Sequence, residues 1–223
     1  MSVSLNKFVA TTGICSRREA DRWIEAGRLT INGTVAIKGN RVEEGDRVEL
    51  DGRTIGSRPE RVYLAFHKPA GVTCTTDARD PDNIIDYLNY PDRIFPVGRL
   101  DKASTGLIFL TNDGDVVNDV LRAEHEHEKE YIVTVDRPLD ARFVERMSGG
   151  LPILGKRTNA CEVEQLGKRK FRIVLTQGMN RQIRRMCEYL GYRVMTLKRV
   201  RIMDVVLGDL PVGHYRELPG FFP

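Results

Sequence analysis

Apolar and polar positions divide the first fifty residues into a helical part and a strand-like part. Apolar residues recur at three- and four-residue spacing within 5–9 and again within 20–24, which is typical of two short amphipathic helices. Ser16, with Glu19 three positions later, has the spacing of a capping box at the start of the second helix. Further on, Asn32-Gly33 separates two short apolar runs and predicts a β-hairpin. The pattern predicts a small α/β module.

The pattern of apolar positions is interrupted after the first fifty residues by a polar stretch. The stretch from Asp51 to Arg61 is polar, has Gly52, Gly56 and Pro59 and no apolar period, and therefore predicts a linker. We divide the chain into a module over 1–55, a linker over 56–61 and a larger domain over 62–223.

Strands dominate the larger domain. Apolar runs predict strands at 62–66, 72–75, 107–111, 131–135, 161–166 and 171–175. Helical spacing predicts helices at 84–88, 115–121, 140–148 and 180–190. Strands interrupted irregularly by helices favour an α+β fold with a mixed, largely antiparallel sheet and flanking helices.

Charge adds one local feature to this picture. The 223 residues carry a net charge of only +4, but Lys168 to Arg201 holds eleven Lys or Arg against one acid, Glu188. This segment has the charge density of a phosphate-binding surface, although a solvated face has the same composition.

Cysteine spacing and hydropathy argue against several classes. The four cysteines lie far apart without a C-x-x-C pair, which argues against a metal site and a disulfide framework and fits a reducing compartment. We find no apolar run long enough to span a membrane and no secretory signal pattern. We expect a cytoplasmic protein with no membrane association.

One turn carries candidate chemistry. Gly98–Leu107 places the carboxylate of Asp101 between a basic residue and a small-residue turn, ahead of the apolar strand predicted at 107–111. A carboxylate presented in this way can serve as a nucleophile or base. By spacing alone, these residues favour an ordinary surface turn before a strand.

The wider motif favours catalysis. Gly98–Gly114 reads G-R-L-D-x-x-(S/T)-x-G-L followed by three apolar residues and T-N-D-G, and it resembles the signature of the RNA pseudouridine synthases that act on ribosomal RNA, the RsuA/RluB/E/F family. The resemblance implies that Asp101 is catalytic. It also implies a catalytic domain with a long bent sheet and flanking helices around a central cleft.

Two further segments match the same family. Lys129–Val133 resembles its K-E-Y-x-V strand, which implies that Tyr131 lies under the target base. Gly178–Met186 resembles its G-x-x-(H/R)-Q-(I/V)-(R/K)-R-M motif, which implies that Arg184 pairs with Asp101. On their own, the tyrosine could be ordinary packing and the arginines an exposed basic helix.

The remaining site residues follow from the same resemblance. Leu197 matches the apolar residue that packs against the base opposite Tyr131, and Arg99 matches an arginine that enters the RNA stack where the base leaves. Lys68, in a K-P-x-G motif, is placed with the RNA-binding residues, although an architectural role is the more natural interpretation of it. We place Arg181 and Arg185 elsewhere on the helix of Arg184, where they would hold phosphates, with Arg181 as the alternative partner of Asp101.

The first module resembles the S4-like RNA-binding module. The resemblance rests on C-S-R-R-E-A within 15–20 and on the N-G turn, and it implies RNA contact by Arg17 and Arg18. The alternative is that the arginines of this helix pair with Glu19, Asp21 and Glu25 on an exposed face.

Together the resemblances imply a site-specific isomerase that converts uridine to pseudouridine in ribosomal RNA. The match is closest to the F type among the enzymes for 23S ribosomal RNA, which implies a stem-loop of that RNA as substrate, with a transfer RNA as a second possibility. The rival is a non-catalytic RNA-binding factor for ribosome assembly. No phosphate loop, dinucleotide fingerprint or zinc pattern appears, so we expect no cofactor and no metal. His125 and His127 lie among acids in what we expect to be a solvated loop, and nothing requires more than a monomer.

Overall fold

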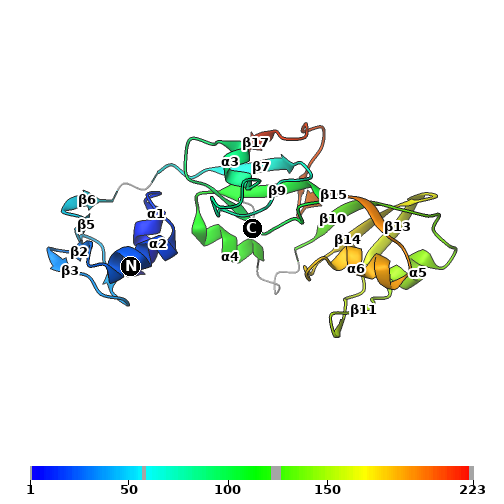
Figure 1. The fold of residues 1–223 in the computed structure, drawn as a ribbon, viewed down its shortest axis with the longest axis horizontal. Helices are drawn as coiled ribbons and strands as arrows, with labels where there is room; N and C mark the ends of the chain where they lie inside the picture. Colours follow the sequence, from blue (N-terminus) through cyan, green and yellow to red (C-terminus); the bar gives the residue numbers. More distant parts are fainter. Residues whose placement is uncertain (1, 57–58, 122–126, 221–223) are drawn as a thin grey trace. The chain divides into compact units, whose positions relative to one another are not determined.

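The computed structural model describes residues 2–56, 59–121 and 127–220, with the backbone alone described at 118–121. These residues form two compact units (Figure 1). The first comprises 1–62, 90–94 and 112–114, and the second comprises 63–89, 95–111 and 115–223.

The first unit is the α/β module. Its helices and strands are α1 (Leu5–Thr11), α2 (Arg17–Glu25), β1 (Val3–Ser4), β2 (Leu29–Ile31), β3 (Thr34–Val35), β4 (Arg41–Val42), β5 (Val48–Leu50) and β6 (Arg53–Ile55). Four strands form a sheet in the order β3-β2-β5-β6, and β1 pairs with β4. The Ser16 hydroxyl accepts a hydrogen bond from the Glu19 amide at 3.1 Å, as an N-cap does. Buried Val9, Ala20 and Ile24 join the two helices in one core.

The polar stretch from Asp51 to Arg61 is not a linker throughout. Arg53–Ile55 forms β6 and pairs antiparallel with β5, within the predicted module bounds of 1–55. A three-residue strand with two polar positions is too short to show an alternation, so the sequence contains no sign of it.

The second unit contains a nine-stranded sheet. Its strands are β7 (Tyr63–Lys68), β8 (Phe95–Val97), β9 (Thr105–Thr111), β10 (Lys129–Val135), β13 (Glu162–Gly167), β14 (Lys170–Leu175), β15 (Val194–Ile202), β16 (Val205–Val206) and β17 (Tyr215–Glu217). They follow the order β13-β14-β10-β15-β9-β7-β17, with β16 on β15 and β8 on β9. A separate hairpin pairs β11 (Pro152–Ile153) with β12 (Lys156–Arg157). Within this sheet β9 and β15 pair in parallel and the other pairs are antiparallel, which confirms the predicted mixed, largely antiparallel α+β fold.

Four helices accompany the sheet: α3 (Ile84–Leu88), α4 (Gly114–Leu121), α5 (Phe143–Ser148) and α6 (Gln182–Tyr189). Asn83 caps α3, which starts and ends where predicted, by accepting hydrogen bonds from the amides of Ile85 and Asp86. Helix α6 begins two residues later than predicted, because Arg181 has a left-handed backbone with φ of 51°.

Two strand predictions need correction. Val72–Thr75 is not a strand, since only Thr73 forms a bridge, to Asn83. The nine-residue strand β15 was not predicted, because Arg199 occupies one of its buried positions and breaks the apolar alternation.

The sheet contains two separate hydrophobic cores. One lies around β10 and β14 with helices α5 and α6, and includes Val133, Phe171 and Ile183. The other lies around β7 and β9, and includes Ala65 and Phe109. Strand β15 contributes to both cores, so it joins the two halves of the sheet.

Candidate active site

Asp101 lies in the loop between β8 and β9, and backbone contacts hold this loop in place. The Gly71 amide donates to the Lys102 carbonyl at 2.7 Å, and the Leu100 amide donates to the Cys74 Sγ at 3.3 Å. A turn bond from the Ser104 amide to the Asp101 carbonyl, at 2.9 Å, closes the loop on itself. The segment after β7 therefore fixes the backbone that carries the carboxylate.

Lys68 is part of this support, and the prediction that it contacts RNA is wrong. It is fully buried, and its Nζ donates to the carbonyls of Pro69 at 2.7 Å, Val72 at 2.8 Å and Lys102 at 3.4 Å. Burial lowers the pKa of the ammonium. Because all three of its donors are used inside the protein, Lys68 ties the turn after β7 to the Asp101 loop.

Arg184 reaches the same loop from helix α6. Its Nε donates to Asp101 Oδ2 at 3.3 Å, and its Nη2 donates to the Ser104 hydroxyl at 3.0 Å and to the Ala103 carbonyl at 3.4 Å. The Arg184 side chain is 10% exposed and that of Asp101 is 29% exposed. The guanidinium is thus a buried counter-charge for a carboxylate that still faces solvent.

Arg181 lies closer to the carboxylate than we predicted. We placed it away from Asp101 on the helix, but its Nη1 is 3.9 Å from Asp101 Oδ2 and its side chain is 45% exposed. The left-handed backbone of Arg181, directly before α6, explains why helical spacing misplaced it. Arg185 does follow the helix, and it donates to the carbonyl and side chain of Asn180.

Tyr131 and Leu197 stand on the adjacent strands β10 and β15. In their register Tyr131 lies opposite Arg199, and Val133 lies opposite Leu197, so these residues share one face of the sheet. Leu197 is 5% exposed in the hydrophobic core around β10, β14, α5 and α6, and the partly buried Tyr131 packs against that core. Their roles towards a base stay predictions.

Arg199 lies outside the motifs that match the family, although it is close to Asp101's loop in the fold. It is 4% exposed, and its Nε donates to the Leu107 carbonyl of β9 at 2.7 Å. At this point the strands come so close that a Cβ on Gly106 would lie 2.2 Å from the Arg199 carbonyl oxygen. The one available signal is its position two residues after Leu197, which puts both on the same face of a strand.

The basic segment from Lys168 to Arg201 is not one phosphate-binding surface. Arg172 and Arg201 both bind Glu130, at 2.8 and 3.0 Å, on the face of β10 opposite Tyr131. Arg184 and Arg199 are buried. Arg99, in contrast, is exposed and has no hydrogen bond or ion pair to any residue that the structure describes.

The described residues offer neither a cluster of metal ligands nor a helix that could span a membrane. The described residues contain no group of three or more His, Cys, Asp and Glu side chains that could hold a metal. His125 and its neighbours over 122–126 lie outside the described residues, whereas His127 lies within them. Along the described chain, no helix has the length and apolar character needed to cross a membrane.

Known proteins match this arrangement along nearly the whole chain. Residues 62–189 match the RNA pseudouridylate synthase family, and residues 3–48 match the S4 domain. The chain belongs to the RNA pseudouridine synthase family. The family predicted from the motifs around Asp101 and Arg184 is therefore confirmed, and the chain is an RNA pseudouridine synthase.

Relatives in this family span a range of identity. The dual-specificity RNA pseudouridine synthase RluF of Escherichia coli K12 is 52% identical over 97% of this chain and 76% of its own length. The ribosomal large subunit pseudouridine synthase B of Bacillus subtilis is 33% identical over 96% of this chain and 91% of its own. A crystal structure of a pseudouridylate synthase, 29% identical, superposes with a TM-score of 0.70 over 97% of this chain and 96% of that one.

Proposed function

We propose that this pseudouridine synthase modifies a uridine in large-subunit ribosomal RNA, and that Asp101 starts the reaction. The observation that carries the proposal is the contact between Arg184 and Asp101 at 3.3 Å, across 83 residues of sequence. A carboxylate that is partly exposed and contacted by a buried guanidinium is held in position and stays accessible, as a nucleophile or base must be.

The isomerisation breaks the bond between uracil N1 and the ribose C1′ and forms one between C5 and C1′. Asp101 attacks the sugar or the base, or removes the ribose 2′ proton, and these routes share the same first residue. The base then turns between Tyr131 and Leu197. The proton lost from C5 balances the one gained at N1, so no cofactor is required. The Tyr131 hydroxyl is our candidate for that transfer, and its ring can stack the flipped base.

RNA contacts are assigned to arginines that solvent reaches; Arg185 is half-buried and the others are exposed. Arg99 would enter the stack where the base leaves, and Arg181 and Arg185 would hold phosphates near Asp101. In the module, Arg17 and Arg18 are exposed at the start of α2 and bind no other described side chain, while Arg22 pairs with Glu19 at 3.1 Å. Unpaired arginines at this position favour a phosphate contact over a purely structural role.

We propose two RNA substrates. The E. coli relative is named as dual-specificity, so we propose a ribosomal stem-loop as the first substrate and a transfer RNA as the second. We expect a monomer in the cytoplasm, where such RNAs occur. The rival is an assembly factor that binds RNA without modifying it.

The test is pseudouridine mapping on transcripts of large-subunit RNA and of transfer RNA, with the wild type and Asp101→Asn. The wild type should modify one uridine in each substrate RNA, and the variant should bind RNA and modify none. Asp204→Asn, which changes an exposed carboxylate on the same domain, is the matched control and should retain the activity. Binding without modification by wild type and control would favour the assembly factor.

A further inference from the structure

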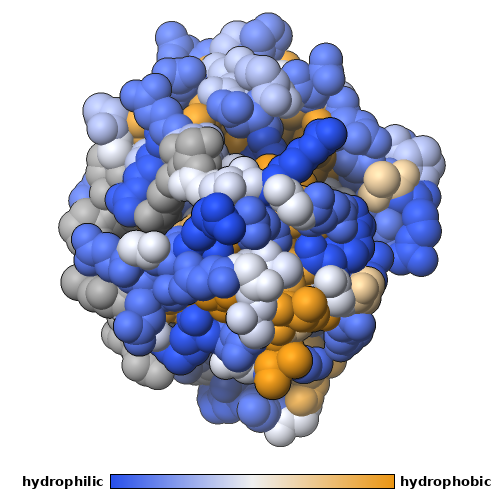
Figure 2. Space-filling view, turned by 90° about the vertical axis from the view of Figure 1, so that its left-hand side faces the viewer, coloured by the Kyte–Doolittle hydropathy of each residue, from blue (hydrophilic) through white to orange (hydrophobic). Residues whose placement is uncertain are grey.

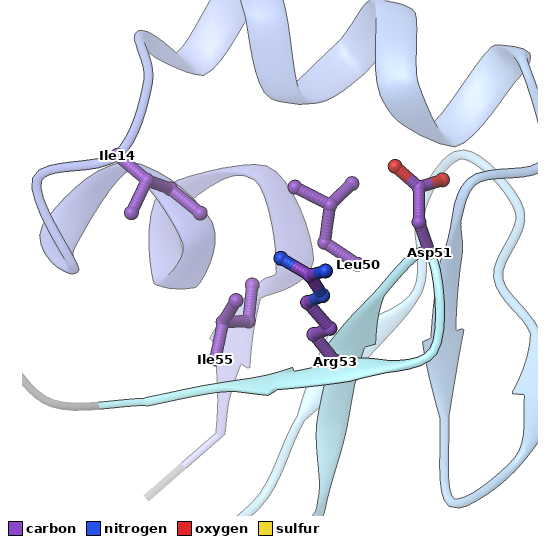
Figure 3. Close-up of a pocket in the computed structure, with 5 residues that line it drawn as sticks. All are labelled: Ile14, Leu50, Asp51, Arg53 and Ile55. Carbon is purple, nitrogen blue, oxygen red and sulfur yellow. The ribbon is translucent and has the colours of Figure 1, made fainter.

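The N-terminal module contains a pocket that the proposed reaction does not use. It has a volume of about 490 Å³ and is lined by Ile14, Leu50, Asp51, Arg53 and Ile55. This volume lies within the ~300–1,000 Å³ that small-molecule sites occupy. In Figure 3, Ile14 comes from the turn between α1 and α2, and the other four residues come from the β5–β6 hairpin opposite it.

The pocket walls are aliphatic. Ile14, Leu50 and Ile55 supply them, and Ile14 is 46% exposed although it is a large apolar side chain. Figure 2 shows a mostly hydrophilic face of the molecule, with small apolar areas. Val35 and Ile37 of the same module are also exposed, but they do not line the pocket.

The charge at the pocket is positive. Its one carboxylate, Asp51, accepts hydrogen bonds from the Nε and Nη2 of Arg28, the shortest of them 2.5 Å. Arg53 is exposed and has no hydrogen bond or ion pair with any part of the chain that the structure describes. Arg17 and Arg18, three and four positions after Ile14, are likewise exposed and unpaired among the described residues.

We infer that this pocket receives one unpaired nucleobase of the bound RNA. The aliphatic side chains would contact the faces of the base, and Arg53 would lie at its edge or on its phosphate. Arg17 and Arg18 would hold the neighbouring phosphates. An apolar cavity beside unpaired arginines complements a nucleotide, which combines an apolar ring with an anion, better than it complements an apolar peptide.

The inference rests on the proposed RNA contact of the module and adds a selection step to it. A pocket for a splayed base cannot be filled by a fully paired helix, because the bases of a duplex stay stacked inside it. The module would therefore favour RNA with a loop or bulge, before Asp101 reaches its uridine.

The experiment compares the affinity of the full-length chain for two RNAs with equal numbers of phosphates. One is a stem-loop with unpaired nucleotides, the other is a blunt duplex, and binding is measured by fluorescence anisotropy at several salt concentrations. Ile14→Ser should weaken stem-loop binding about tenfold, because the base would lose the apolar contact of a half-exposed isoleucine. It should change duplex binding by less than about twofold and leave the salt dependence unchanged.

Ile37→Ser is the matched control, because it makes the same substitution at an isoleucine of this module that is 67% exposed and does not line the pocket. It should change neither affinity. A second pocket variant, Arg53→Gln, lies on the exposed surface and should weaken stem-loop binding and reduce the salt slope by about 0.7, the value for one phosphate of a single strand.

The outcomes separate the two proposals. Equal losses on both RNAs, or no loss with either pocket variant, would overturn the nucleobase site; the second result would also be expected of a pocket that binds a protein. If Arg17→Gln with Arg18→Gln still weakens both RNAs in that case, RNA binding by the module stands without the pocket. Failure of the wild type to form pseudouridine would instead contradict the proposed function.

Discussion

The two halves of the catalytic sheet contribute to the site in different ways. The half around β7 and β9 supplies Asp101 from a loop, which backbone groups and the buried Lys68 hold in place. The half around β10 and β14 supplies Tyr131 from a strand and Arg184 from helix α6, where regular structure fixes the side chains. A carboxylate on a loop needs additional hydrogen bonds to hold the loop in place, whereas the position of an arginine on a helix is set by the packing of that helix on the core.

The halves meet at a narrow joint. Strands β9 and β15 pair through only two residue pairs, Lys198 with Thr105 and Arg199 with Gly106. The alignment of Asp101 with Arg184 therefore depends on this joint together with the contacts of the two side chains themselves. The following variants test how separate the halves are.

The largest effect is expected at the joint. Gly106 has φ of 116°, and its Cβ would lie 2.2 Å from the Arg199 carbonyl oxygen and 2.5 Å from the Arg199 nitrogen. Gly106→Ala must therefore separate the strands and strain the backbone, and should lower the free energy of unfolding by at least about 4 kcal/mol. Denaturant unfolding measures this loss. Gly178→Ala is the control, because Gly178 is exposed and a Cβ there would have no atom within 4 Å. An equal loss of stability in Gly178→Ala would contradict a specific role for the close approach of β9 and β15.

Next comes the support of the Asp101 loop. Lys68→Met removes a buried donor from three carbonyl oxygens and should cost about 3 kcal/mol of stability, because the carbonyls lose their partner inside the protein. Activity should fall as well, since the loop loses its position. Lys102→Met tests an exposed lysine of the same loop, paired with Asp82 at 2.7 Å, and should cost less than about 1 kcal/mol. Similar losses in thermal unfolding would show that burial of Lys68 is unimportant.

The contact between the halves should affect the rate more than the fold. Arg184→Lys keeps the charge but loses the forked geometry that reaches Asp101, Ala103 and Ser104, and should lower kcat/KM about 100-fold, or about 2.7 kcal/mol. Single-turnover pseudouridine formation measures it. Arg193→Lys, at an exposed arginine of the same domain to which no RNA contact is assigned, should lose less than about threefold.

Combining Arg184→Lys with Asp101→Asn sharpens this test. Since Asp101→Asn is expected to form no pseudouridine, the variants are compared by denaturant unfolding. If the two side chains stabilise the fold through their contact, the loss of stability in the double variant should be smaller than the sum of the two single losses. Additive losses would mean that Arg184 acts independently of Asp101.

The smallest effect concerns the outer face of β10. The hydrogen-bonded Arg172 guanidinium lowers the pKa of Glu130. A lowered pKa stabilises the fold above the ordinary glutamate value of about 4.3, and this contribution disappears as the pH falls through the lowered pKa. Glu130→Gln should cost about 1 to 2 kcal/mol at pH 7 and converge with the wild type in acid.

Denaturant titrations from pH 7 to pH 3 follow this convergence. Glu145→Gln, at an ion pair with Arg142 that is 3.8 Å long and largely exposed, is the control and should change stability by less than about 0.5 kcal/mol. A difference between Glu130→Gln and wild type that persists unchanged at pH 3 would rule out the electrostatic origin.

Much of this molecule is predictable because its signals are local. The Ser16 cap and the Asn32-Gly33 turn are readable, since each depends on residues a few positions apart. The buried runs of β9 and β14 are readable for the same reason. The motif around Asp101 also identified the family, because a resemblance needs only the order of residues.

The predictions that failed depend on distant partners. Lys68 looks like a solvated lysine until the carbonyls of its turn and of Lys102 close around it. Arg181 looks like a helix residue until its left-handed backbone turns it towards Asp101. Strand β15 was not predicted because Arg199 looks like a solvated residue in the sequence. In the fold it is buried, and its partner, the Leu107 carbonyl of β9, lies 92 residues earlier in the chain.

The order of residues alone was enough to specify many of the local elements, the fold class and the family, because spacing and motif order are properties of the chain. Tertiary contacts decided which charges face solvent and which are buried, and brought Arg184 to Asp101 through the close approach of β9 and β15 at Gly106. Burial and charge pairing depend on contacts between strands that are far apart in the sequence. The spacing of apolar residues within one strand carries no information about those contacts.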